Sequence, residues 1–260
     1  MTFPRLRHPI VLAHGLLGFA RFVVGDVVVA SYFRGIPEML TAAGNRVLVP
    51  AVPATGSIVR RAEALAAAIR RDAAGERVHV IAHSMGGLDA RHAIAHLGLA
   101  DQVVSLTTLA TPHRGTPVAD RGTDLADRAG VLARMPALGF DVAAYRDLRT
   151  DACAAFNAAT PDAPGVRYAS FAGSKPRGET IVALRWTHDL IAGAAGAGGG
   201  GNDGLVAVSS AHWGASSETV AADHFDFVGW TPVVAGPLGR PVDVAALWKR
   251  FLGPAAAADR

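Results

Sequence analysis

The stretch Ile81-Ala82-His83-Ser84-Met85-Gly86-Gly87 decides how this sequence is interpreted. The apolar run Val78–Ala82 predicts a buried strand and Gly86–His96 predicts a helix, so Ser84 falls on the sharp turn between them. Such a turn needs small residues two positions before and two positions after the serine, and an alanine and a glycine stand there. We expect the turn to hold the Ser84 hydroxyl clear of the backbone, as a nucleophile requires. The alternative is an ordinary strand-to-helix turn that carries a serine by chance.

Short apolar runs alternate with helical patterns over the first half of the chain. Ser57–Arg70 places apolar residues on one helical face, and the further predicted strands are Ile10–Ala13, Arg46–Val52, Val103–Leu109 and Val166–Phe171. Strands separated by helices predict a mostly parallel sheet covered by helices on both faces. With 260 residues, half of them apolar, the chain is expected to form one α/β domain over residues 1–260.

The pattern changes between residues 116 and 160, where no strand is predicted. Helical stretches around Asp124–Met135 and Asp141–Ala159 predict an insertion packed over the carboxyl edge of the sheet. Beyond it, the Gly- and Ala-rich stretch Ala192–Gly201 predicts a loop. Val242–Leu252 predicts a last helix that ends at Gly253-Pro254.

Glycines also follow the first predicted strand, in His14-Gly15-Leu16-Leu17-Gly18. Acyl transfer at a serine needs backbone N–H groups that stabilise the oxyanion of a tetrahedral intermediate. Since glycine lets a turn approach a substrate closely, we expect these donors to be the amides of Leu16 and of Met85. The alternative is a glycine-rich turn without a chemical role. Because this glycine-rich turn occurs in the same chain as the Ser84 turn, we favour the oxyanion hole over that alternative.

An acid and a base would complete the site in the chain order serine, acid, histidine. Of the ten histidines, His188, His212 and His224 lie far enough along the chain to serve. Asp203 stands in the turn Asn202-Asp203-Gly204 before an apolar run, which suits an orienting carboxylate. His212 follows Asp203 by only nine residues, so His224 is the preferred base. We expect His212 to pack near the site without titrating for catalysis.

Composition excludes several classes of protein. The formal net charge is only +3 and the basic residues are scattered, so a nucleic-acid partner is not expected. No apolar run reaches the roughly 18 residues of a membrane span, and no secretory signal is recognised. A cytoplasmic protein, signal-independent export and a signal that has been removed all remain open. Cys153, the single cysteine, excludes an intramolecular disulfide and is expected to be a small core residue rather than a nucleophile.

Motifs over most of the chain support a resemblance to a known family. They are Pro9–Phe19, Tyr32–Pro37, the Ser84 turn, Thr111–Thr116, Ala154–Asn157, Asn202–Val206 and His224–Asp226. On these motifs the chain resembles the bacterial true-lipase family of the α/β-hydrolase superfamily, typified by Pseudomonas, Burkholderia and Proteus lipases. The resemblance implies an α/β-hydrolase fold with Ser84, Asp203 and His224 as triad, and with Leu16 and Met85 as oxyanion donors. The chain departs from typical members in lacking the disulfide pair and the first glycine of the serine turn.

The function that the resemblance implies is a serine carboxylic-ester hydrolase. Within that class we expect a triacylglycerol lipase that forms an acyl-enzyme on Ser84 and meets its lipid or ester substrate at an oil–water interface. A broad-specificity carboxylesterase or polyester hydrolase would share every catalytic residue. A non-hydrolytic acyltransferase or lyase would favour another acceptor over water. A complete triad argues against a non-catalytic binding module.

The insertion at residues 116–160 matches the lid region of that family. A lid that opens would expose apolar side chains, namely Leu125, Val131, Leu132, Met135 and Leu138. The same residues would also suit an ordinary amphipathic helix buried on the core. The family resemblance favours the lid.

The resemblance also implies a structural calcium ion behind the catalytic histidine, although no cofactor is expected for catalysis itself. Asp226 would be one ligand, and Asp189 is the choice for the second carboxylate, with Glu179 in reserve. The carbonyl groups of Trp230 and Val234 would complete the site, since calcium takes about six to eight oxygen ligands. The alternative is that Asp226 is a surface or salt-bridged acid.

Overall fold

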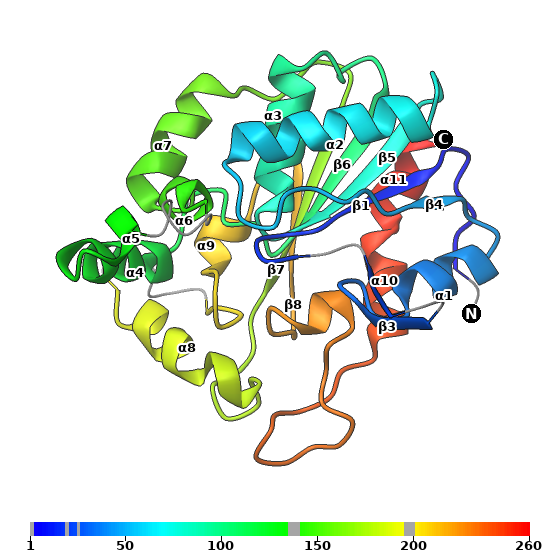
Figure 1. The fold of residues 1–260 in the computed structure, drawn as a ribbon. Coiled ribbons are helices and arrows are strands. Elements are labelled where there is room, and N and C mark those ends of the chain that lie inside the picture. Colours follow the sequence, from blue (N-terminus) through cyan, green and yellow to red (C-terminus); the bar gives the residue numbers. More distant parts are fainter. Residues whose placement is uncertain (1–2, 19–20, 25–26, 135–140, 195–200) are drawn as a thin grey trace.

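A parallel sheet forms the centre of the molecule in a computed structural model that describes residues 3–18, 21–24, 27–134, 141–194 and 201–260 (Figure 1). Its six strands lie in the order β4-β1-β5-β6-β7-β8, and every neighbouring pair is parallel. Their bounds are Ile10–Ala13 for β1, Val47–Leu48 for β4, Val78–His83 for β5, Val103–Leu109 for β6, Arg167–Gly173 for β7 and Ser216–Val220 for β8. The predicted α/β class is confirmed.

Apolar residues cover both faces of the sheet, because successive side chains of a strand point to opposite faces. In β1, Ile10 and Leu12 join one core cluster, whereas Val11 and Ala13 join another. The first cluster packs against α1 (Ile36–Ala42), α10 (Val244–Phe251) and α11 (Gly253–Ala258), and the second against α2 (Ile58–Asp72) and α3 (Gly86–His96). Each face of the sheet therefore has its own hydrophobic core, as a doubly covered sheet requires.

Helix α2 illustrates how the local sequence defines an element. The Ser57 side chain accepts a hydrogen bond from the amide of Arg60 at 3.3 Å and so caps the helix. Ala62, Leu65 and Ile69 are buried on the face turned to the sheet. The predicted helix over Ser57–Arg70 is confirmed.

The strand order brings two turns together. Strand β1 lies between β4 and β5, so the loop that leaves β1 and the turn that leaves β5 emerge side by side at the carboxyl edge. Ligands of open α/β sheets bind at such a point, where the strand order reverses direction. This is the edge that carries Ser84.

Between residues 116 and 160 the structure describes 116–134 and 141–160, and these parts contain helices, as predicted, although the helices are short. They are α4 (Pro117–Arg128), α5 (Val131–Arg134), α6 (Ala143–Asp147) and α7 (Thr150–Ala159). Thr116 caps α4 by accepting a hydrogen bond from the amide of Val118 at 3.3 Å, and a proline opens the first turn. Helix α8 (Arg185–Ala192) lies beside α4 (Figure 1). The predicted residues Met135 and Leu138 fall outside the described residues.

Several elements differ from the sequence prediction. An antiparallel pair, β2 (Arg21–Val24) and β3 (Val27–Ser31), was not predicted, and the strand expected over residues 46–52 is only two residues long. The C-terminal helix ends near the predicted position, but Gly253-Pro254 begins helix α11, because proline is tolerated in a first turn. Over the parts of the chain that the structure describes, no helix combines the length and apolar character needed to cross a membrane.

Candidate active site

Ser84 occupies a strained turn between β5 and α3. Its φ is 56°, a left-handed value that is uncommon for a residue other than glycine. Two hydrogen bonds hold its backbone: its amide donates to the Leu109 carbonyl at 2.9 Å, and the Thr111 hydroxyl donates to its carbonyl at 2.8 Å. A Cβ on Gly86 would lie 2.7 Å from the Ala13 carbonyl oxygen, so α3 can start here only with glycine. The predicted geometry of the turn is present.

The loop after β1 lies against this turn. A Cβ on Gly15 would approach the Ser84 Cβ to 2.7 Å, so glycine is required where the two segments meet. The amide of Gly18 donates to the Gly15 carbonyl at 3.2 Å and closes a turn around Leu16. Among the residues that the structure describes, neither the Leu16 amide nor the Met85 amide donates to a protein acceptor. Both N–H groups are therefore available to a ligand, as an oxyanion hole requires.

A buried ion pair that the sequence did not reveal fixes this loop. Arg61 of α2 is fully buried, donates to the His14 carbonyl at 2.7 Å and pairs with Asp89 of α3 at 2.8 Å. A buried charge is stable only when it is paired and hydrogen-bonded. The only sequence signal was an arginine next to the apolar face of α2.

Asp203 and His224 meet at the same edge of the sheet. His224 Nδ1 donates to Asp203 Oδ2 at 2.8 Å, and both side chains are almost completely buried. The other carboxylate oxygen, Oδ1, accepts the amides of Leu205 at 2.8 Å and Val206 at 2.7 Å. Because both oxygens of the Asp203 carboxylate accept hydrogen bonds, this carboxylate holds the His224 imidazole in the tautomer whose Nε2 is free to accept a proton.

The other two candidate histidines lie elsewhere. His212 contacts the Thr219 hydroxyl at 3.0 Å, and His188 contacts the Lys175 carbonyl at 3.1 Å. Neither lines the cavity onto which Ser84 opens. Cys153 is buried, and burial raises the pKa of its thiol to about 12, so its expected place in the core is confirmed.

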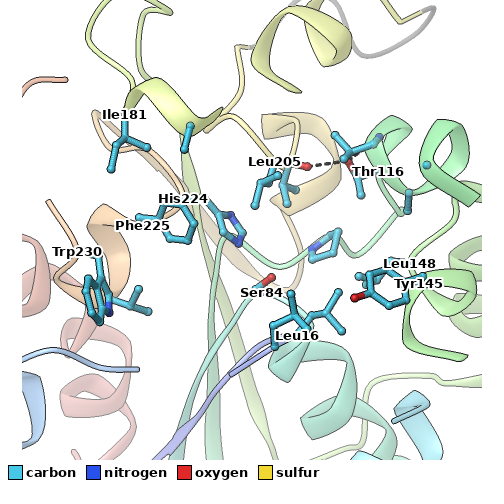
Figure 2. A pocket seen from close by; sticks show the side chains of 18 of the residues that line it. Leu16, Ser84, Thr116, Tyr145, Leu148, Ile181, Leu205, His224, Phe225 and Trp230 are labelled. Carbon is cyan, nitrogen blue, oxygen red and sulfur yellow. Dashed lines mark hydrogen bonds between the residues drawn. The ribbon is translucent and has the colours of Figure 1, made fainter. Parts of the chain in front are cut away.

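Ser84 and His224 open onto an apolar cavity of about 1030 Å³. Figure 2 shows the His224 ring directed toward the Ser84 hydroxyl, with apolar side chains around both. The lining comes from α4 and α5, from the segment around Ile181 and from the loop around Trp230. Of the predicted lid residues, Leu132 is buried and lines the cavity, whereas Leu125 is exposed.

The residues expected to hold calcium do not form such a site. Asp226 is buried, but its Oδ2 contacts the Lys175 ammonium at 2.7 Å. Asp189 is exposed and pairs with Arg177 at 2.7 Å. An ammonium group in contact with the buried carboxylate excludes a second cation from the same oxygen.

The reserve carboxylate is also engaged elsewhere. Glu179, the reserve carboxylate, pairs with Arg240 at 3.2 Å. Within the described residues, no group of three or more acidic, histidine or cysteine side chains could hold a metal ion. Calcium needs about six to eight oxygen ligands, and the three carboxylates named for it are paired with Lys175, Arg177 and Arg240, so the residues present do not fit the ion.

Comparisons with known proteins identify similar chains. Residues 52–129 match the family model of the PGAP1-like alpha/beta domain. The chain is 32% identical to a triacylglycerol lipase of Vibrio cholerae, over 82% of this chain and 76% of that protein. It is 29% identical to triacylglycerol lipase 2 of Saccharomyces cerevisiae, over 86% of this chain and 81% of that protein.

Solved structures show the same fold. The crystal structure of mature Bacillus licheniformis lipase BlEst2 matches with a TM-score of 0.67 at 24% identity, over 88% of this chain and 89% of that one. At this identity the likeness concerns the fold, which is that of the α/β-hydrolases.

Proposed function

This chain belongs to the triacylglycerol lipase family of α/β-hydrolases and is a carboxylic-ester hydrolase, and from that premise we propose that it hydrolyses triacylglycerols through an acyl-enzyme on Ser84. The observation that carries the proposal is the placement of Ser84 and His224 together on a large apolar cavity. The motifs shared with the Pseudomonas, Burkholderia and Proteus lipases support placing the chain near that branch.

In the proposed mechanism, His224 Nε2 accepts the Ser84 proton while Oγ attacks the ester carbonyl carbon. The oxygen that becomes negatively charged faces the Leu16 and Met85 amides, which stabilise it. Collapse of the intermediate breaks the ester bond, and His224 donates its proton to the departing alcohol. Water then attacks the acyl-enzyme by the same route, which releases the fatty acid and restores Ser84. Asp203 stabilises the imidazolium in both halves of the reaction.

Apolar side chains at the mouth of the cavity support a lipid substrate. Leu17 and Leu238 line the cavity and are more than half exposed, with 60% and 63% of their surface accessible. Exposed apolar groups at the rim of an apolar pocket suit contact with an oil surface. Because α4 forms one wall of this cavity, we propose that α4 and the helices after it act as the lid.

The test compares esters of different length and physical state. Wild-type enzyme is expected to hydrolyse both emulsified long-chain triacylglycerols and soluble p-nitrophenyl butyrate. Ser84→Ala is expected to lower kcat by a factor of about 10⁶, as loss of a triad serine does. Ser209→Ala, at an exposed serine, is the matched control and should retain full activity.

Two outcomes would contradict the proposal. Full ester turnover by Ser84→Ala would exclude the acyl-enzyme mechanism. Turnover of short soluble esters alone, with triacylglycerol emulsions untouched, would instead identify a carboxylesterase that uses the same residues.

A further inference from the structure

A buried lysine lies behind the loop that carries His224. Lys175 follows strand β7 and is only 4% exposed. Its ammonium group contacts Asp226 Oδ2 at 2.7 Å, Asp223 Oδ2 at 3.2 Å and the carbonyl oxygen of Arg240 at 2.7 Å. An ammonium has three N–H donors, and these three oxygens use all of them. The proposed mechanism gives this cation no role.

The two carboxylates flank His224 and shape the backbone around it. Asp223 Oδ1 accepts the amides of Phe225 at 3.2 Å and of Asp226 at 3.3 Å. Asp226 Oδ2 accepts the amide of Asp223 at 2.8 Å. Both aspartates are fully buried. The His224 loop is therefore folded around two negative charges that water does not reach.

These charges need a counterion. Two buried carboxylates repel each other, and each has lost its hydration. Burial and the charge of Asp223 raise the pKa of Asp226, and Lys175 opposes this shift. Asp226 Oδ1 has no hydrogen-bond partner among the described residues, so the ammonium group is the main compensation for that carboxylate.

The same cluster connects the His224 loop to the cavity wall. Asp223 Oδ2, which contacts the Lys175 ammonium, also accepts the amide of Ile181 at 3.0 Å. Ile181 lines the cavity (Figure 2). Through Arg240, the ammonium also holds the segment that precedes α10. One cation therefore joins three parts of the chain around the candidate base.

We propose that Lys175 is a positioning residue whose ammonium group is the permanent cation that holds the His224 loop, so that catalysis needs no calcium ion behind the histidine. This role rests on the proposed function of His224 as the base. A lysine is covalently part of the chain and cannot be removed by a chelator. The loop therefore keeps its shape at any calcium concentration.

The first experiment replaces the charge and measures the chemical step per active site. Lys175→Met keeps the length of the side chain but removes its charge, and sites are counted by the burst of p-nitrophenol from a phosphonate ester. With p-nitrophenyl butyrate, kcat per titrated site should fall at least about tenfold while KM stays within about twofold, because a displaced base slows the reaction without removing binding contacts. Lys249→Met, at a partly exposed lysine of α10, is the matched control and should change neither constant.

A second substitution tests whether charge balance is the cause. In Lys175→Met/Asp226→Asn the cluster carries the same net charge as in the wild type, so kcat should recover at least about threefold relative to Lys175→Met. A merely structural role predicts a different result: fewer titrated sites in Lys175→Met, each with the wild-type kcat. That result would overturn the proposal.

The wild-type enzyme provides a test that does not depend on the folding of a variant. Activity should be unchanged by excess EDTA and by added calcium. Asp226→Asn, which keeps an oxygen for Lys175, should retain kcat within about threefold. Loss of wild-type activity in EDTA with recovery in calcium would overturn the role of Lys175. The Ser84→Ala variant tests the proposed function separately. If it is inactive, the acyl-enzyme mechanism holds even when the role of Lys175 is overturned.

Discussion

His83 Nε2 lies 3.1 Å from the backbone carbonyl oxygen of His224, so a histidine of strand β5 directly supports the candidate base. The Tyr32 hydroxyl lies 2.7 Å from the other ring nitrogen of His83. Burial and the nearby His224 hold the pKa of His83 well below its usual value, so the ring is neutral. A neutral ring has one donor and one acceptor, which fits donation to His224 and acceptance from Tyr32.

His83→Phe should destabilise the fold and slow the enzyme. The variant leaves the buried His224 carbonyl without its partner and removes the contact with the Tyr32 hydroxyl, so the free energy of unfolding should fall by about 3 kcal/mol. Tyr32→Phe removes one hydroxyl only and should cost about 1 kcal/mol. Urea unfolding of both variants measures the difference, and equal losses would show that the His83–His224 contact contributes nothing.

Asp203→Asn should reduce the rate without changing the fold. The Oδ1 contacts to Leu205 and Val206 can persist, but an amide at the Oδ2 position favours the wrong tautomer of His224. We expect kcat to fall by a factor of about 10⁴, with little change in KM. Asp101→Asn, at an exposed aspartate, is the control for steady-state kinetics. A loss below tenfold would exclude Asp203 as the orienting acid.

Gly15→Ala should be far more harmful than Gly122→Ala. The new Cβ at residue 15 would lie 2.7 Å from the Ser84 Cβ, whereas at residue 122 it meets nothing within 4 Å. The first variant displaces the loop that presents the Leu16 amide, so kcat should fall about 100-fold. The second replaces a helical glycine and should raise the free energy of unfolding by about 0.5–1 kcal/mol. Comparable activity of the two variants would contradict the proposed oxyanion hole.

Stability should decline below pH 6.5 because of His14. Burial lowers the pKa of His14 from 6.5 to about 4, so the unfolded chain binds the proton first as the pH falls. The free energy of unfolding therefore decreases as the pH falls from 6.5 toward 4. Between about pH 7.5 and 5.0, wild type should lose about 2 kcal/mol more than His14→Asn in urea unfolding. Parallel pH profiles of the two proteins would contradict this.

Elements defined by local patterns were predictable from the sequence. Helix α3 and strand β6 have their predicted bounds, because a helix that starts at a Gly-Gly pair after a strand and a β-branched run each contain their own signal. The positions of Ser84, Asp203 and His224 were predictable as well, since chain order and turn chemistry restrict the choice. Their catalytic roles stay predictions.

Features that depend on contacts between distant segments were not predictable. Strand β8 has a polar sequence and pairs with β7 alone at the edge of the sheet, so no apolar alternation identifies it. The buried Arg61 and Lys175 find their carboxylates 28 and 48 or more residues away. A single lysine before Pro176 gives no local indication of that pairing. The family resemblance implied a calcium ion at Asp226, whereas the structure places the Lys175 ammonium group against that carboxylate.

The strand order separates the parts of the chain that set reaction rate from those that set substrate choice. The nucleophile and the candidate oxyanion amides leave neighbouring strands of the rigid sheet, whereas α4, α5 and the segment around Ile181 belong to excursions outside it. Exchange of α4 and α5 between relatives would alter acyl-chain selectivity and leave the nucleophile and the oxyanion amides in place, whereas the segment around Ile181 is joined to the His224 loop through Asp223. For protein engineering, the helices of the cavity wall can be exchanged while the central sheet stays the same.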